Sequence, residues 1–137
     1  MNAKQYLRQA YKLNERIKDK QERIECLRLM STSIGAIDYS KDRVQSSPSG
    51  DAPFARQVMQ IVQFEEELEE DKNRMKELFA QISRQIDKLE NTNHILVLSK
   101  RYLLMKTWEQ IAEDMNYSVM QIHRIHKEAL ECFVVPE

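Results

Sequence analysis

Glycine and proline are scarce in this 137-residue sequence, which contains two glycines and three prolines, and aromatic residues make up only 7%. Proteins built from many short strands need turn residues at short intervals, so this scarcity argues against a sheet protein. Charged residues, in contrast, make up 31% of the chain. These proportions predict long solvated helices, and we expect an all-α fold.

Several functional signatures are also missing. Cys26 and Cys132 lie far apart without paired spacing, which fits reduced thiols and a cytoplasmic protein. We find no signal peptide and no apolar run of membrane length, so we expect no membrane partner. A Gly-rich phosphate loop and a nucleophile elbow are absent as well, so we expect neither an enzyme nor a cofactor. The net charge of −1 does not by itself indicate a nucleic-acid-binding protein.

Two parts of the sequence contain residue types that can bind a metal ion. His123 and His126 are three residues apart on one predicted helix, a spacing that can hold a metal ion. A complete site would also need Glu128 or Cys132, and Cys132 lies six residues beyond His126 and points elsewhere. We therefore expect no metal site, with His123 facing phosphate or base and His126 facing solvent. The acidic run at residues 65–71 is expected to be a solvated helix face.

Residues 93–133 have the pattern of a helix-turn-helix motif. Thr107 and Gln110 predict a capping box for its first helix, and Ser118 is expected to cap the second. Ala112 is small enough for the closest approach of two helices, and Asn116 suits a left-handed turn residue. The apolar side chains expected to close the helices on each other, counted from Trp108, are Ile111, Met115, Tyr117, Ile122 and Ile125.

The second helix of the motif, at about residues 118–130, is the predicted recognition helix. Its outward face is cationic, because no carboxylate occurs between Ser118 and Lys127. Gln121 and Arg124 carry the fork-shaped groups that pair with adenine and guanine edges. The full set of candidate DNA-binding residues is Val119, Met120, Gln121, His123, Arg124, Lys127, Arg101, Lys106 and Thr107. The alternative is a helical hairpin that only packs, with a solvated cationic face.

The run from Leu98 to Ser118, continued by Ile122, Ile125, Ala129 and Leu130, resembles region four of bacterial sigma factors. The resemblance covers about a third of the chain, and its most informative parts are Arg101-Tyr102, Trp108 to Ala112, and Ala129-Leu130. It implies a module that recognises the upstream promoter element and touches the flap of RNA polymerase.

Residues 39–47, which follow a basic helix, are similar to phage-encoded sigma-like regulators of the ArpU type. This second resemblance would cover nearly the whole chain. The sequence departs from sigma factors at Val119 and Met120, where sigma factors usually carry polar base-reading side chains, and it has no counterpart of the promoter-melting region. A complete sigma factor is therefore not expected, and the recognised DNA sequence cannot be carried over.

Two long helical segments are predicted before this motif. Residues 3–30 are basic, with eight Lys or Arg against four Asp or Glu, and residues 55–90 contain an acidic stretch. Both have apolar residues at coiled-coil spacing, interrupted by Lys20 in the first segment and by Asp71 in the second. We expect an antiparallel hairpin in which these two charges meet and set the register. Pairing of two chains as a homodimer is the competing arrangement.

The segment between the two helices, at about residues 31–54, has the composition of a flexible linker. Within it, residues 34–39 are apolar enough to fold back onto a helix, and Ser46 and Ser47 are either modification sites or plain linker residues.

These inferences give two predicted domains: a helical hairpin at residues 1–92 and a helix-turn-helix domain at residues 93–137. The predicted function is sequence-specific binding of double-stranded DNA in transcription control, resembling a phage late-gene regulator, with RNA polymerase as a second candidate partner. The alternative is a coiled-coil interaction protein that binds polymerase or another regulator without touching DNA.

Overall fold

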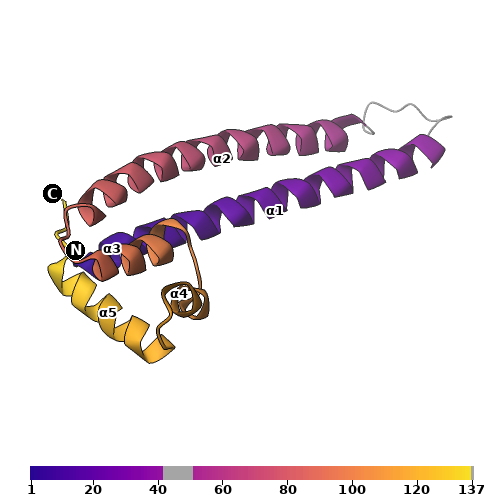
Figure 1. The fold of residues 1–137 in the computed structure, drawn as a ribbon. Coiled ribbons are helices and arrows are strands. Elements are labelled where there is room, and N and C mark those ends of the chain that lie inside the picture. The colour runs from indigo at the N-terminus through magenta and orange to yellow at the C-terminus, as the bar shows by residue number, and fades with distance from the viewer. Residues whose placement is uncertain (42–50, 137) are drawn as a thin grey trace. The chain divides into compact units, whose positions relative to one another are not determined.

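The computed structural model describes the backbone of residues 1–41 and 51–136 and the side chains of residues 1–31 and 55–136. All regular structure in the described backbone is helical, which confirms the predicted all-α fold. In chain order (Figure 1), the elements are α1 (Ala3–Lys41), α2 (Asp51–Ile86), α3 (Thr92–Leu98), the π-helical turn η1 (Ser99–Leu103), α4 (Trp108–Met115) and α5 (Val119–Cys132).

The first long helix extends further than predicted. It was expected to end near Met30, but α1 continues to Lys41. Residues 34–39, which were expected to fold back onto a helix, continue α1 instead. An isolated glycine such as Gly35 costs only about 1 kcal/mol inside a helix, and a long helix tolerates this loss.

The second long helix begins earlier and ends earlier than predicted. It starts at Asp51, because Pro53 is compatible with the first turn of a helix. It ends at Ile86 and not near Glu90, and a short turn leads to Asn91, which caps α3. The rest of the expected linker, residues 42–50 with Ser46 and Ser47, lies outside the described residues.

Contacts along the chain define two compact units, one made of residues 1–14 and 74–137 and the other of residues 15–73. This grouping differs from the expected division between residues 92 and 93. It places the first turns of α1 and the last turns of α2 in the same unit as the C-terminal helices.

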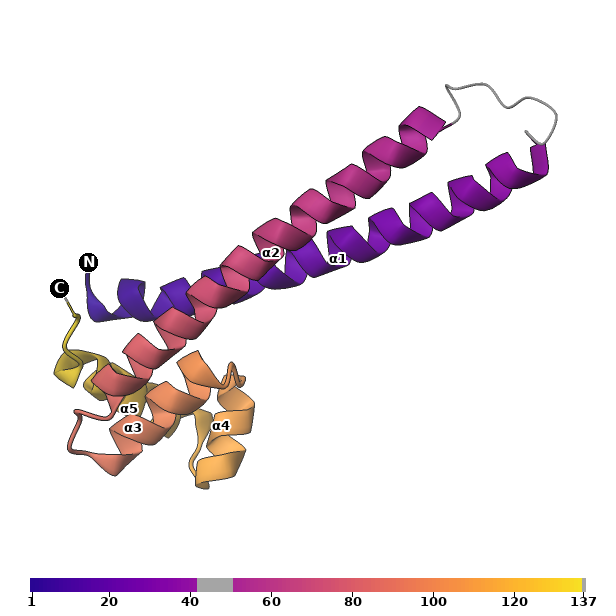
Figure 2. The ribbon, with the colours of Figure 1, turned by 90° about the horizontal axis from the view of Figure 1, so that it is seen from above.

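The unit of residues 1–14 and 74–137 contains a buried cluster that joins its N-terminal and C-terminal segments. Its apolar residues come from α1, from the end of α2 and from the C-terminal helices, and α3, α4 and α5 lie together in both views (Figure 1 and Figure 2). The buried members are Tyr6, Leu7, Ala10, Ile82, Ile86, Leu98, Tyr102, Ala129 and Phe133. Full burial of a large apolar side chain contributes roughly 1.5–3 kcal/mol, so this cluster holds α5 in place.

The unit of residues 15–73 contains the paired middle parts of α1 and α2. Lys20 contacts Asp71, Arg28 contacts Glu65, and the Ser31 hydroxyl donates to Oε1 of Gln57 at 2.8 Å. From Lys20 to Ser31 the position on α1 increases, while the position of the partner on α2 decreases from Asp71 to Gln57. The two helices are therefore antiparallel, as predicted. On α1, two of the apolar residues at coiled-coil spacing on either side of Lys20, Ile17 and Ile24, are buried.

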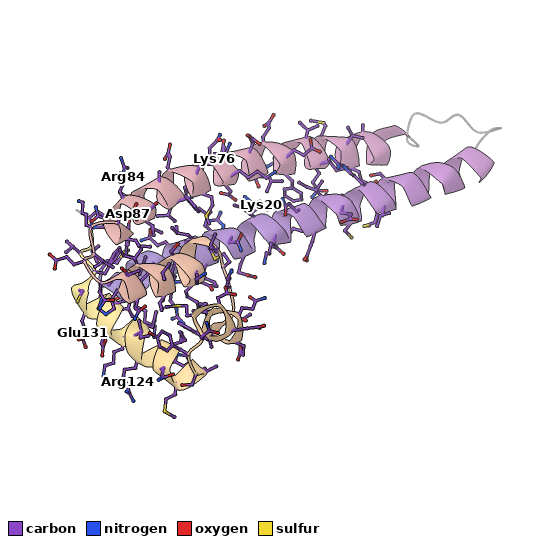
Figure 3. All side chains as sticks on the ribbon, in the orientation of Figure 1. Lys20, Lys76, Arg84, Asp87, Arg124 and Glu131 are labelled. Atoms are coloured by element: carbon purple, nitrogen blue, oxygen red, sulfur yellow. The ribbon has the colours of Figure 1, made fainter. Side chains whose placement is uncertain are left out.

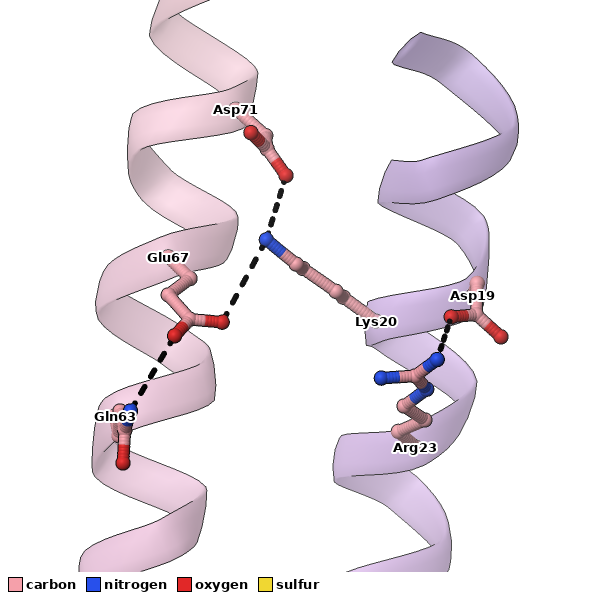
Figure 4. A network of polar contacts seen from close by, with 6 residues as sticks. All are labelled: Asp19, Lys20, Arg23, Gln63, Glu67 and Asp71. Atoms are coloured by element: carbon pink, nitrogen blue, oxygen red, sulfur yellow. Dashed lines mark hydrogen bonds and ion pairs between the residues drawn. The ribbon is translucent and has the colours of Figure 1, made fainter. Parts of the chain in front are cut away.

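Lys20 and Asp71 meet between the two helices, which confirms the predicted match of the two polar interruptions. The Lys20 Nζ donates to the Asp71 Oδ2 at 2.8 Å, and it lies 3.6 Å from the Glu67 Oε2 (Figure 4). Only 5% of the Asp71 side chain and 14% of the Lys20 side chain are exposed, whereas Glu67 is 39% exposed. A buried ion pair of this kind is best understood as a determinant of register, because desolvation offsets much of its attraction.

The geometry of this pair predicts that Lys20→Leu destabilises the protein more than Asp71→Leu. Lys20→Leu removes the cation between two carboxylates, and breaking a buried ion pair in this way costs roughly 3–5 kcal/mol. Asp71→Leu leaves Lys20 beside the partly exposed Glu67, so its loss should be smaller. The double variant should fall within about 1 kcal/mol of the wild type. Urea denaturation, read as the free energy of unfolding, measures all three.

An exposed ion pair within α1 provides the control. Arg23 contacts Asp19 at 2.9 Å, and more than half of each side chain is exposed (Figure 4). Arg23→Leu should therefore change the free energy of unfolding by less than about 0.5 kcal/mol. If the double variant at positions 20 and 71 lost the sum of the two single losses, the two residues would not act as a pair.

Candidate nucleic-acid interface

The helix-turn-helix at residues 107–132 has the local structure that the sequence predicted. The Thr107 hydroxyl accepts the N–H of Gln110 at 3.2 Å, and the Gln110 side chain accepts the N–H of Thr107 at 2.9 Å. This is the expected capping box at the start of α4. Asn116 then has φ 59° and ψ 40°, the predicted left-handed conformation. Ser118 caps α5, also as predicted.

The core between α4 and α5 is small and well defined. Ile111, Ala112 and Ile122 are buried together with Val97 of α3. Ala112 lies in this core, as expected for a small residue between crossing helices. Trp108, Met115 and Ile125 pack against the same cluster and are partly buried.

Tyr117 is the one predicted core residue of this motif that the structure places elsewhere. It is 36% exposed, and its hydroxyl accepts a hydrogen bond from the Asn93 side chain at 3.2 Å. The prediction that Tyr117 closes the two helices on each other is therefore wrong. The left-handed Asn116 redirects the chain before Tyr117, and this backbone change breaks the helical spacing on which the prediction relied.

The outward face of α5 brings six of the nine candidate residues together. Val119, Met120, Gln121, His123, Arg124 and Lys127 are all exposed. Met120 has 74% of its surface exposed, and Val119 has 36%. Figure 3 shows Arg124 pointing away from the rest of its unit, near the N-terminal end of α5. Glu131, the nearest labelled carboxylate of this helix, lies close to the other end (Figure 3).

Gln121 has a structural role in addition to its exposed position. Its Oε1 accepts the N–H of Ser118 at 2.9 Å, and its own N–H donates to the Ser118 hydroxyl at 3.1 Å. A bidentate contact to adenine uses both the oxygen and the nitrogen of an amide. Since the side-chain oxygen of Gln121 already accepts a hydrogen bond, Arg124 is the better candidate on this face for a bidentate contact with a base.

Lys106, another candidate residue, lies in an ion-pair cluster. Its Nζ is 2.6 Å from the Asp114 Oδ2, and the Lys100 Nζ is 3.6 Å from the same oxygen. The hydrogen bond from Lys106 and the neighbouring positive charges lower the pKa of the Asp114 carboxyl. One carboxylate therefore offsets part of the charge that Lys106 and Lys100 would present to DNA.

Arg101 is held by its surroundings and is only partly exposed. Its guanidinium lies 4.2 Å from the centre of the Trp108 ring and 4.8 Å from the centre of the Tyr11 ring. Its Nη1 also donates to the carbonyl oxygen of Lys106 at 3.0 Å. The Trp108 ring in turn contacts the His123 ring, with ring centres 4.5 Å apart. These contacts connect Arg101 to the outward face of α5 through Trp108.

The π-helical turn gives Arg101 and Tyr102 their positions. At the end of η1 the Leu104 N–H donates to the Ser99 carbonyl at 3.0 Å, and just after it the Lys106 N–H donates to the Lys100 carbonyl at 2.9 Å. The wider turn is closed by Met105, which has a left-handed φ of 56°. Such turns change the direction of side chains within a helix. This turn could not be predicted from the residue types, since Met105 is not a residue type that favours positive φ.

His126 is buried, which corrects the expectation that it faces solvent. Only 8% of its surface is exposed, and its Nε2 lies 2.7 Å from the Tyr102 hydroxyl in a hydrogen bond. Burial is the main cause that lowers the pKa of His126 to about 4, with a further contribution from Lys4. Burial also raises the pKa of Tyr102 to about 12. Both side chains are therefore neutral at physiological pH.

The burial of His126 was not predicted, although it directly follows the apolar Ile125. The two residues share the inner side of α5, and helical spacing places position 126 four residues after the buried Ile122. Because histidine is a polar residue, the helical pattern predicted that His126 faces solvent. The partner that makes burial possible, Tyr102, is distant in sequence and on a different element.

Two kinds of feature are absent from the described part of the chain. Within residues 1–41 and 51–136, no helix is both long enough and apolar enough to cross a membrane. The described side chains also contain no group of three or more His, Cys, Asp or Glu that could hold a metal ion.

Comparison with known protein families gives a match over most of the chain. The profile of a family described as protein of unknown function (DUF1492) matches residues 36–133. No curated protein and no solved structure matches the chain.

The left-handed turn at Asn116 predicts a simple pair of stabilities. Asn116→Gly should be neutral or stabilising, because glycine adopts this conformation without a side-chain clash. Asn116→Ala should lower the free energy of unfolding by up to about 1–2 kcal/mol, because alanine keeps the Cβ clash of the left-handed conformation but loses the short polar side chain that can offset this clash by hydrogen-bonding locally. Thermal and urea denaturation of the two variants test this, and equal stability of both would contradict a positive φ at this position.

The burial of His126 predicts a loss of stability in mild acid. The pKa of His126 is about 4 in the folded protein and about 6.5 when unfolded, so between these values only the unfolded state binds the proton. Above pH 6.5 this residue makes no pH-dependent contribution. As the pH falls from 6.5 to 4, it should destabilise the protein by about 2–3 kcal/mol.

The control for this prediction is His126→Gln, which retains a polar group near Tyr102 but does not titrate. Urea denaturation at several pH values between 7.5 and 4 should show a smaller loss for His126→Gln than for the wild type. Parallel pH profiles for the two proteins would show that His126 is not the group responsible.

Proposed function

The chain belongs to the family described as protein of unknown function (DUF1492), and from its helix-turn-helix we propose that it binds double-stranded DNA sequence-specifically in the control of transcription. The observation that carries this proposal is the outward face of α5. That face combines exposed Arg124, Lys127 and His123, has no carboxylate between Ser118 and Lys127, and stands on a helix whose opposite side is buried. A helix of this kind fits the major groove with its N-terminal side chains at the base edges.

Within this proposal, the residues of α5 have different roles. Arg124 reads guanine, because its guanidinium can donate to both O6 and N7 of that base. Lys127 contacts phosphate and adds affinity without sequence preference. Val119 and Met120 are apolar and exposed, which suits contact with the methyl group of thymine. This explains why the face can be selective although sigma factors usually have polar side chains at these two positions.

The finer proposal is a sigma-like regulator of phage late genes that works with RNA polymerase in the cytoplasm. It rests on the resemblance of residues 98–130 to sigma region four, and the structure supports it with two capped helices joined by a left-handed residue. The chain would use its helix-turn-helix to recognise a promoter-proximal site. The hairpin of α1 and α2 would be available for a protein partner.

A second candidate function is a protein-interaction module, and one observation favours it. The early part of α2 exposes three apolar side chains, Val58, Met59 and Val62, on neighbouring positions of one helix. Exposed apolar residues that cluster in this way are typical of protein contacts. A partner such as polymerase or another regulator could bind there whether or not α5 binds DNA.

The DNA-binding proposal predicts different effects for two variants of α5. Arg124→Ala should weaken binding to the preferred site by about 1–3 kcal/mol and flatten the preference among sequences. Lys127→Ala should weaken binding to all sequences equally and reduce the slope of affinity against salt by about 1. Binding-site selection from random duplexes, followed by titrations at several salt concentrations, measures both effects.

Two exposed cations on α2, Arg84 and Lys76, provide matched controls, because they lie away from α5 (Figure 3). Arg84→Ala and Lys76→Ala should leave site preference and affinity nearly unchanged. Failure of the wild-type protein to bind any duplex up to tens of micromolar would rule out the DNA-binding proposal. It would leave the protein-interaction module as the better account.

A further inference from the structure

A cavity of about 510 Å³ lies beside α5, within the unit of residues 1–14 and 74–137. Its walls come from the first turns of α1, from η1, from the first residue of α4 and from the middle of α5. The residues around it include four cations and no carboxylate. This cavity is distinct from the outward face of α5, although His123 borders both.

Three of the four cations form one row on α1. Lys4, Arg8 and Lys12 follow each other at intervals of four residues, so they lie on the same side of the helix. All three are exposed, and no carboxylate among the described side chains forms an ion pair with them. Like charges at this spacing repel each other and weaken a helix. A row of this kind therefore suits an anionic ligand that would offset the repulsion.

The fourth cation, Arg101, is fixed in the wall of the cavity. It lies between the rings of Tyr11 and Trp108 and donates to the Lys106 carbonyl. A guanidinium that is already held in place loses little side-chain entropy when it binds an anion. Its remaining N–H groups have the planar arrangement that matches the oxygens of a phosphate.

The aromatic residues around the cavity identify the ligand further. Trp108 is in contact with Arg101, with His123 and with His126, whose ring centre lies 4.8 Å from that of Trp108. Tyr102 is stacked on His126 at 5.7 Å. These rings therefore already contact one another or the Arg101 guanidinium. The cavity presents positive charge, and this favours a phosphate group over a base.

We propose that this cavity is a phosphate-binding site that holds the DNA backbone next to α5, with Lys4, Arg8, Lys12 and Arg101 as its cations. The inference rests on the proposed DNA binding, because its source of phosphate is the duplex on which α5 lies. A helix in the major groove has a phosphate backbone on either side, and the cavity lies beside α5 within the same unit. The first turns of α1 thereby become part of the DNA-binding surface.

The same chemistry could come from a free phosphate compound, so the source has to be tested. A site for the DNA backbone adds affinity that depends on salt and is independent of sequence. A site for a free compound would bind inorganic pyrophosphate tightly in the absence of DNA. The experiment therefore includes both ligands.

The test compares the full chain with the variant Lys4→Gln/Arg8→Gln/Lys12→Gln. The matched control is Lys76→Gln/Arg84→Gln/Lys88→Gln. It also removes two lysines and one arginine, here from other exposed positions of the same unit. Each protein is titrated with its selected duplex and with a scrambled duplex at several salt concentrations. Circular dichroism and thermal denaturation establish that all three proteins are folded.

We expect the α1 variant to bind both duplexes roughly tenfold or more weakly, with a salt slope smaller by about 2–3, while its preference for the selected duplex is retained. The control variant should lose much less affinity, and pyrophosphate should not bind at micromolar concentration. If the wild type binds DNA but the two variants lose affinity equally, the phosphate site is overturned and the proposed function stands.

Two other results would also decide the matter. Tight binding of pyrophosphate to the wild type, lost in the α1 variant, would overturn the DNA backbone as the source and identify a free phosphate compound. Absence of any duplex binding by the wild type would overturn the proposed function and this inference together.

Discussion

Burial of the apolar cluster that joins α1 to α5 is the constraint on which both cationic surfaces depend. Leu7 and Ala10 of α1 share this cluster with Leu98 and Ala129, and all four are almost completely buried. Because α5 is held on its inner side by Ala129 of this cluster and by Ile122 of the smaller core with α4, its opposite side has to face solvent. The same packing turns the row of Lys4, Arg8 and Lys12 toward the cavity that Arg101 and His123 also border. Burial of the inner sides of α1 and α5 therefore orients two sets of charges that are far apart in sequence.

Buried polar groups have a different function from the apolar cluster. They select one arrangement among several that apolar packing alone would allow. Lys20 between Asp71 and Glu67 sets the register of the antiparallel helices, where apolar seam residues alone would permit a shift by one heptad. The Tyr102–His126 hydrogen bond fixes η1 against α5 in a similar way. In both cases each polar group would be costly to bury without its partner.

Local sequence was sufficient wherever one helix end or one turn determines the conformation. The capping boxes at Thr107 and Ser118 and the left-handed Asn116 involve residues within a few positions of each other, so their side chains and backbone are compatible in only a few ways. The antiparallel hairpin could also be predicted, because complementary charge and two matched seam interruptions are visible in the sequence. Helix ends were less accurate, since Gly35 looked like a break but is tolerated inside α1.

The sequence by itself determined the all-α fold, the position of the helix-turn-helix and the pairing of Lys20 with Asp71, because each follows from helical periodicity or from charges on matching positions. Only the tertiary structure decided that His126 is buried, that Arg101 lies between Tyr11 and Trp108, and that α1 contributes three cations to a cavity beside α5. The physical reason is that these arrangements join residues separated by many positions. Their partners are chosen by the packing of whole helices, which periodicity within one helix does not specify.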